Sequence, residues 1–143
     1  MSLVERVYVA LGSNQGDRAT YLSRAREAVG RIPLTKVLAT SSVEETEPVG
    51  GPPQERFLNQ MLLAETALDP SRFLKALQKI EADQGRVRGG ERWGPRTLDL
   101  DIVRFGTRRL RETDLVIPHP ELPRRPFWQR EIEEIERGLS EKS

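Results

Sequence analysis

Residues 97–105 read Thr-Leu-Asp-Leu-Asp-Ile-Val-Arg-Phe, and the interpretation of the whole chain starts from this stretch. Successive side chains of a β-strand point to opposite faces. The sequence therefore predicts a strand with Leu98 and Leu100 on one face. Asp99 and Asp101 share the other face, about 7 Å apart, where two carboxylates can bind hard cations such as magnesium. On its own, Asp-x-Asp is more often the solvated face of a half-buried sheet.

The segment directly upstream, residues 86–96, reads Arg-Val-Arg-Gly-Gly-Glu-Arg-Trp-Gly-Pro-Arg. Its four arginines can neutralise a polyphosphate, and Gly89 and Gly90 give the backbone conformational freedom. An arginine loop beside two carboxylates is typical of phosphoryl-type transfer. A solvated surface or a nucleic-acid patch is the alternative meaning of such a loop.

The composition bounds the class of protein. With 143 residues, 36% hydrophobic and 31% charged, the chain suits a single globular domain over residues 1–143. It has no cysteine, which excludes disulfides and thiolate metal ligands. No apolar run approaches the roughly 20 residues of a membrane span, and no signal pattern is present. We expect a cytoplasmic protein without a membrane partner.

Periodicity and turn residues predict the other elements. They are a strand over residues 7–11, a helix over 22–32, a strand over 36–44, a loop over 46–53, a strand over 57–66 and a helix from Asp69-Pro70 to Gly85. The order strand, helix, strand, strand, helix, strand predicts an α+β fold, the ferredoxin-like βαββαβ antiparallel sheet with both helices on one face. Residues 115–117 are expected to add an edge strand. An extra C-terminal helix follows, with Ile132 and Ile135 as its apolar stripe.

Taken together, these residues resemble the 6-hydroxymethyl-7,8-dihydropterin pyrophosphokinase family. The resemblance rests on Gly12-Ser13-Asn14, Phe57-Leu58-Asn59, Glu81, Gly85-Arg86-Val87-Arg88, the run from Arg92 to Asp101, and Pro118-His119-Pro120. It covers about residues 6–127. Family members often have tyrosine at the position of Phe57, and they usually continue after Phe127 with an apolar strand. Here residues 128–143 form a divergent, charged tail.

The resemblance implies an ATP-dependent diphosphotransferase. Such an enzyme transfers pyrophosphate from ATP to 6-hydroxymethyl-7,8-dihydropterin, giving AMP and the pterin diphosphate, a step in folate biosynthesis. It also implies two magnesium ions as cofactors and ATP as co-substrate. The partners expected are these small molecules and no nucleic acid. We expect a monomer, with a dimer as the alternative.

Residue roles carry over position by position. The resemblance implies that the catalytic residues are Arg86, Arg96, Asp99 and Asp101, that Asp99 and Asp101 are the metal ligands, and that the arginines lie on a loop closing over both substrates. The pterin-binding residues implied are Thr46, Pro48, Val49, Phe57, Asn59, Trp93, Asp99 and Phe127. The ATP-binding residues implied are Gln78, Glu81, Arg88, Arg92, Trp93, Arg96, Ile102, His119 and Arg125. Residues 12–14 are interpreted as a turn that supports the pterin site.

Several alternatives stay open from the residues alone. Phe57 and Phe127 fit ordinary core aromatics, and Gln78 and Glu81 fit the solvated face of a helix. Asn59 is harder to explain by packing, because a buried amide needs hydrogen-bond partners. For the whole chain, the alternatives are an RNA-binding domain, a phosphokinase that releases ADP, and a catalytically weak relative of the family.

Overall fold

The computed structural model describes residues 4–47, 55–85 and 97–142. The elements are, in chain order, β1 (Glu5–Ser13), α1 (Arg18–Gly30), β2 (Thr35–Thr40), β3 (Glu44–Thr46), β4 (Phe57–Thr66), α2 (Pro70–Asp83), β5 (Asp99–Phe105), β6 (Leu110–Glu112), β7 (Leu115–Ile117), the 3-10 turn η1 (Leu122–Arg124) and α3 (Pro126–Lys142). None of the helices in these ranges is long and apolar enough to cross a membrane.

The main sheet is antiparallel, with the strand order β2-β4-β1-β5 and with β3 paired to the end of β4. β4 and β1 are therefore the central strands. The first and third strands of the predicted pattern lie side by side, between the second and the fourth. This is the arrangement of the split βαβ unit, so the predicted fold class is confirmed.

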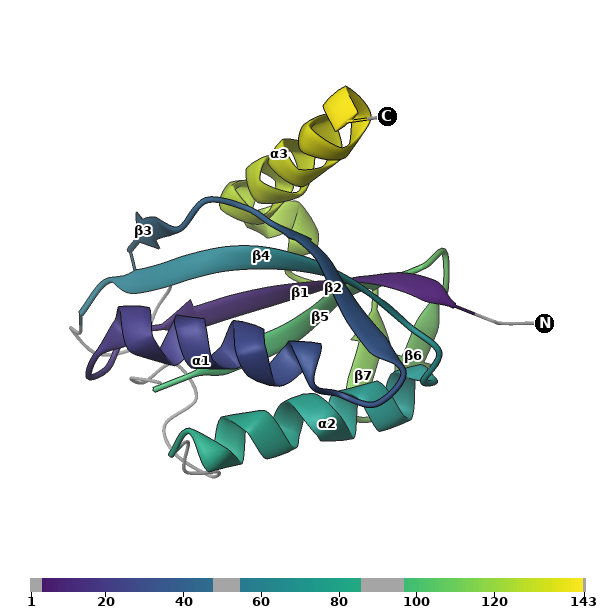
Figure 1. The fold of residues 1–143 in the computed structure, drawn as a ribbon, viewed down its shortest axis with the longest axis horizontal. Helices are drawn as coiled ribbons and strands as arrows, with labels where there is room; N and C mark the ends of the chain where they lie inside the picture. The colour runs from purple at the N-terminus through teal and green to yellow at the C-terminus, as the bar shows by residue number, and fades with distance from the viewer. Residues whose placement is uncertain (1–3, 48–54, 86–96, 143) are drawn as a thin grey trace.

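The helices lie on both faces of the sheet (Figure 1). α1 and α2 cover one face, as predicted, and α3 covers part of the other. The first core, between the sheet and α1 and α2, includes Val9, Leu11, Leu62, Phe73, Leu77, Leu100 and Ile102. The second core, beneath α3, consists of Tyr8, Ala10, Met61, Leu63, Val103, Trp128, Ile132 and Ile135. The charged C-terminal helix is thus part of the fold, with a wider buried stripe than its two isoleucines predict.

Local signals set the start and end of α2. The side chain of Asp69 accepts a hydrogen bond from the backbone N–H of Arg72 at 2.8 Å, and Pro70 occupies the first helical position. Gly85 follows the helix with φ of +89°, a conformation that favours glycine. The helix predicted from Asp69-Pro70 to Gly85 is confirmed.

The single strand predicted over residues 36–44 is wrong. The structure ends β2 at Thr40 and begins β3 at Glu44. Ser41 and Ser42 between them are held by side chains from outside the strand: Gln60 donates to the carbonyl oxygen of Ser41, and the N–H of Ser42 donates to a carboxylate of α3. Apolar residues occupy odd positions on both sides of this break in the sequence, but the structure does not keep that alternation. The pairing shifts between Val37 and Ala39, so Val37 packs against the first core and Ala39 against the second.

Three smaller expectations also need correction. Gly12 and Ser13 belong to β1 and not to a turn after it. Thr46, expected in a loop, is the last residue of β3. Residues 115–117 do form a strand, β7, but it pairs with β6 in a separate two-stranded sheet and not with the edge of the main one. Glu112 lies opposite Leu115, so a two-residue turn sets this pairing.

Candidate active site

Asn59, Gly12 and Asp99 form one row across three neighbouring strands. Gly12 of β1 lies opposite Asn59 of β4 on one side and opposite Asp99 of β5 on the other. Residues directly opposite one another share a face, and this is the face that α3 partly covers. With strands about 4.8 Å apart, the two side chains stand roughly 10 Å apart with only a glycine between them. Gly12 thus forms a flat floor between an amide and a carboxylate.

The space above this floor is bounded by Phe57. A Cβ added at Gly12 would lie 3.5 Å from the Phe57 ring and 3.4 Å from the Asn59 side-chain oxygen. A side chain at position 12 would therefore occupy the space between the ring and the amide. Phe57 is half-buried and lies two residues before Asn59 on the same strand face. The ring, the amide and the floor are adjacent, as the predicted pterin site requires.

Asn59 is buried, with 7% of its surface exposed, and its amide is oriented by a neighbouring strand. Its Nδ2 donates to the hydroxyl oxygen of Thr46 on β3. Thr46 lies opposite Phe57 in the β3–β4 register. This hydrogen bond occupies the NH₂ end of the amide and presents the carbonyl end, a hydrogen-bond acceptor, toward Gly12.

The two carboxylates of β5 lie where the alternation predicts. Leu98, Leu100 and Ile102 are buried in the first core, whereas Asp99 and Asp101 are half-buried on the opposite face. Asp101 lies opposite Ala10, one row along from the row of Gly12. The expectation of two carboxylates on one strand face is confirmed as geometry.

His119 lies beside Asp101, with its Nε2 3.7 Å from a carboxylate oxygen. His119 is held through both its backbone and its ring: the backbone N–H donates to the carbonyl of Val103 at 2.9 Å, and the ring Nδ1 accepts the N–H of Glu121 at 3.0 Å. Because Nδ1 is an acceptor, a neutral imidazole carries its proton on Nε2. The 3.7 Å separation is beyond hydrogen-bond distance, so the structure places this nitrogen beside the Asp101 carboxylate without a direct bond between them.

The N-terminal end of α3 completes this side of the site. The rings of His119 and Trp128 meet edge to face at 5.0 Å, and the guanidinium of Arg125 lies over the Trp128 ring at 4.6 Å. The Nε of Arg125 is buried, and no hydrogen-bond partner for it exists within the described residues. Phe127 is half-buried next to Trp128. The structure thus brings Asp101, His119, Arg125 and Phe127 to one region.

The remaining nucleotide-side residues lie elsewhere. Gln78 and Glu81 are on α2, and Ile102 is buried in the first core, on the opposite sheet face from Asp101. Glu81 is only 7% exposed, and its carboxylate accepts the backbone N–H of Leu100 at 2.7 Å. This excludes the solvated-helix interpretation for Glu81. This hydrogen bond ties α2 to β5 at Leu100, the residue between Asp99 and Asp101. The ATP-binding roles of Gln78, Glu81 and Ile102 stay predictions.

Some of the predicted site lies outside the described residues. These positions are Pro48, Val49, Arg86, Arg88, Arg92, Trp93 and Arg96. Their roles, and the closing arginine loop, stay predictions.

One buried carboxyl group near the site was not anticipated. Glu131 of α3 is 2% exposed, and burial, with a further contribution from the nearby carboxylate of Glu44, raises its pKa to about 9. The sequence alone could have indicated a buried glutamate here. Positions 128, 131, 132 and 135 have the spacing of the apolar face of a helix, and only position 131 is charged.

The fold and the site define the class. An antiparallel α+β domain that places two carboxylates, an oriented amide and aromatic rings on one sheet face has the groups that a small-molecule phosphoryl-type transferase needs. The family model described as 7,8-dihydro-6-hydroxymethylpterin-pyrophosphokinase matches residues 8–137. The chain therefore belongs to this family.

Named relatives agree with this assignment. The chain is 44% identical over 125 residues to the 2-amino-4-hydroxy-6-hydroxymethyldihydropteridine pyrophosphokinase of Pseudomonas aeruginosa, which covers 87% of this chain and 76% of the relative. The protein of the same name from Bacillus subtilis is 42% identical over 128 residues, covering 90% and 76%. The expected enzyme class, ATP-dependent pyrophosphoryl transfer in folate biosynthesis, is confirmed.

A solved structure supports the fold. The chain described as "Crystal Structure Analysis of the HPPK-DHPS in complex with substrates" aligns with a TM-score of 0.59 and 13% identity. The alignment covers 78% of this chain and 29% of the other. At this identity the likeness establishes the architecture alone.

Proposed function

We propose that this chain transfers the β,γ-pyrophosphoryl unit of ATP to the hydroxymethyl group of 6-hydroxymethyl-7,8-dihydropterin on the sheet face that carries Asn59, Gly12 and Asp99. The observation that supports this most directly is the strand register. It sets an amide acceptor and a carboxylate on either side of a glycine floor. A flat heterocycle bound at the amide therefore directs a substituent toward the carboxylates.

The pterin end is recognised by three groups. The amide of Asn59, oriented by Thr46, presents its oxygen to a ring N–H of the pterin. The rings of Phe57 and Phe127 stack on the two faces of the heterocycle, an arrangement that needs no tyrosine hydroxyl at position 57. Backbone groups of Pro48 and Val49 and the side chain of Trp93, outside the described residues, are proposed to complete the contact.

The phosphate end uses Asp99 and Asp101. Within the described residues no group of three or more His, Cys, Asp or Glu side chains could hold a metal ion. Two carboxylates nevertheless fit magnesium, which is usually held by one or two carboxylates together with substrate phosphate oxygens and water. Magnesium bound there would neutralise charge on the phosphate oxygens and lower the pKa of the attacking hydroxyl. His119 lies beside this pair, with its Nε2 3.7 Å from a carboxylate oxygen of Asp101.

The arginines supply the remaining positive charge. Guanidinium groups of Arg86 and Arg96 are proposed to pair with the transferring phosphates, where a planar two-pronged donor matches the oxygens. Arg125 and His119, beside Trp128, are proposed to contact ATP from the α3 side. Gln78, Glu81, Arg88, Arg92 and Ile102 keep their proposed nucleotide roles. We also propose that the protein acts as a cytoplasmic monomer.

The test is product analysis with ATP, magnesium and 6-hydroxymethyl-7,8-dihydropterin. We expect AMP, whereas ADP would indicate an ordinary phosphokinase and absence of turnover would indicate a catalytically weak relative. Asp99→Asn and Asp101→Asn should each lower kcat by at least about 100-fold, equal to about 2.7 kcal/mol. Asp114→Asn, an exposed acid in the β6–β7 turn, is the matched control. Activity within tenfold of wild type in either site variant contradicts the metal-ligand assignment.

A further inference from the structure

Glu131 is a carboxyl group in an apolar setting. It lies on the buried stripe of α3 between Trp128 and Ile132, and both of its carboxyl oxygens are inaccessible to solvent. Neither oxygen has a hydrogen-bond partner of standard geometry within the described residues. An ionised carboxylate in such a place is costly, so the group stays protonated when buried. The established and proposed chemistry does not use it.

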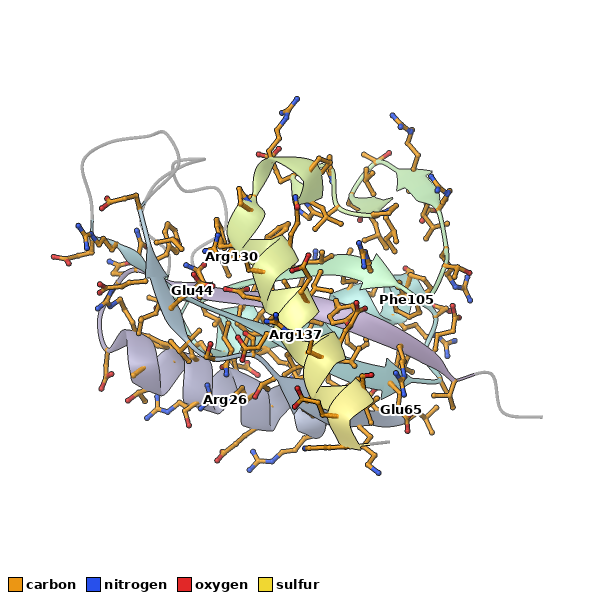
Figure 2. All side chains as sticks on the ribbon, turned by 90° about the horizontal axis from the view of Figure 1, so that it is seen from above. Arg26, Glu44, Glu65, Phe105, Arg130 and Arg137 are labelled. Carbon is orange, nitrogen blue, oxygen red and sulfur yellow. The ribbon has the colours of Figure 1, made fainter. Side chains whose placement is uncertain are left out.

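The turn of α3 that carries Glu131 is attached to the connection between β2 and β3. The carboxylate of Glu134 accepts from the N–H of Ser42 at 2.7 Å and from its hydroxyl at 2.8 Å. Arg130 donates to the carboxylate of Glu44 at 2.8 Å, and Figure 2 shows these two side chains beside each other. Three positions of one helical turn thus face the start of β3.

The segment held in this way leads directly into the pterin site. β3 ends at Thr46, which lies opposite Phe57 and accepts the hydrogen bond of Asn59. On the helix side, Phe127 lies one turn before Glu131, and residues four apart share a helix face. The two walls proposed for the pterin, Phe127 on α3 and Phe57 with Asn59 on β4, are therefore joined through the contact between α3 and β3.

The charges around Glu131 oppose its ionisation. Glu44 faces it from β3, and Glu134 and Arg130 flank it on α3. From β1, the hydroxyl of Tyr8 is bonded to Glu136, one turn further along the helix. Two nearby acids and a single base leave an ionised Glu131 repelled by Glu44, the residue through which Arg130 binds β3. Loss of the Glu131 proton should therefore loosen the contact between α3 and β3.

We propose that uncharged Glu131 is a positioning residue that holds α3 against β3 and thereby sets the separation of Phe127 from Phe57 and Asn59 for pterin binding. The proposal rests on the proposed function, because the roles of these three residues are assigned there. It predicts that ionisation of Glu131 weakens pterin binding selectively. Glutamine at this position keeps the shape and cannot ionise, so it should preserve binding at all pH values.

The experiment compares wild type with Glu131→Gln between pH 7.5 and 10, measuring kcat and the KM for pterin and for ATP. At pH 7.5 the two proteins should agree within about twofold. When a binding-competent form falls to a tenth of the population, the apparent affinity falls about tenfold. At pH 10, one unit above the pKa of about 9, the pterin KM of wild type should therefore exceed that of the variant about tenfold. The ATP KM should agree within about twofold.

Two controls make the outcome decisive. Ionisation of the substrates affects both proteins equally, so the ratio of their KM values isolates the effect of residue 131. Glu133→Gln changes an exposed glutamate of the same helix and should follow wild type throughout. Identical pterin profiles for wild type and Glu131→Gln, or equal effects on ATP and pterin, would overturn the proposal. Failure of wild type to form AMP at pH 7.5 would instead overturn the proposed function.

Discussion

The Glu131→Gln substitution should stabilise the protein, and the gain should grow with pH. Glu131 is 2% exposed, and burial raises its pKa to about 9 from a usual value of 4.5, with Glu44 contributing in the same direction. In the unfolded chain the same carboxyl group regains its ordinary pKa. At any pH between 4.5 and about 9, folding of the wild type therefore requires the carboxyl group of Glu131 to take up a proton. The glutamine variant folds without this proton uptake.

The sign and the magnitude follow from proton linkage. The folded state binds more protons than the unfolded state above pH 4.5, so the free energy of unfolding falls as the pH rises toward 9 and then levels off. Each pH unit in this window corresponds to about 1.36 kcal/mol. At pH 7, 2.5 units above the ordinary pKa of 4.5, protonating Glu131 lowers the free energy of unfolding by about 3 kcal/mol. At pH 5.5, one unit above that pKa, the loss is only about 1 kcal/mol. Local relaxation around the carboxylate makes these values upper bounds.

The assay is urea-induced unfolding of wild type and Glu131→Gln at pH 5.5, 7 and 8.5, followed by circular dichroism. We expect the stability difference between the two proteins to increase at each step. The exposed Glu133→Gln variant provides the control, in which the difference from wild type should not change with pH. A constant difference between Glu131→Gln and wild type across this range would show that Glu131 folds in its ionised form and would refute the reasoning.

Two further predictions concern a strained turn and the pterin amide. Leu34 is 70% exposed and has a φ of +58°, in the left-handed region. Leu34→Gly should remove backbone strain of about 1–2 kcal/mol. The greater backbone entropy of glycine in the unfolded chain offsets about 0.5–1 kcal/mol of this gain. The melting temperature should rise slightly, whereas exposed Val43→Gly should lower it; a lower value for Leu34→Gly contradicts the strain argument. Asn59→Ala should weaken pterin binding by about 1–3 kcal/mol and leave ATP binding unchanged in calorimetric titrations. Equal losses for both ligands would assign Asn59 to packing.

Much of the main fold follows from local signals. Strand alternation in residues 97–105 places the leucines in the core and the aspartates on the other face, and the Asp69-Pro70 start and the glycine after α2 set its ends. These features depend on backbone geometry and on neighbours in the sequence. They could therefore be predicted without knowledge of what each element contacts.

The errors occur where distant side chains decide the local structure. The break between β2 and β3 depends on Gln60 of β4 and Glu134 of α3, which bond to Ser41 and Ser42. In the sequence, apolar residues at odd positions continue past these two serines, so the pattern reveals neither the break nor the shift in pairing between Val37 and Ala39. The pairing of β7 with β6 is a second case, in which a two-residue turn brings the partner closer than the main sheet.

The site shows the same division. The sequence indicates candidate residues for the chemistry, and their roles stay predictions. The row formed by Asn59, Gly12 and Asp99 depends on register between strands far apart in the chain. Local pattern alone therefore indicates a turn at residues 12–14, whereas the register places Gly12 within β1, between the amide and the carboxylate. A glycine inside a strand often marks a close approach by a ligand or another backbone. That rule would have identified Gly12 as part of the site.

Glu131 illustrates a limit of a different kind. A single glutamate on the apolar stripe of a helix has no defined role until the surface opposite it is known, because the same residue could be paired, solvated or protonated. The structure places it opposite Glu44, whose carboxylate is bonded to Arg130 and whose strand leads to Thr46 and Asn59. Its protonation state is therefore coupled to the position of the strand that orients the pterin amide. This coupling spans α3, β3 and β4, and only their packing against one another reveals it.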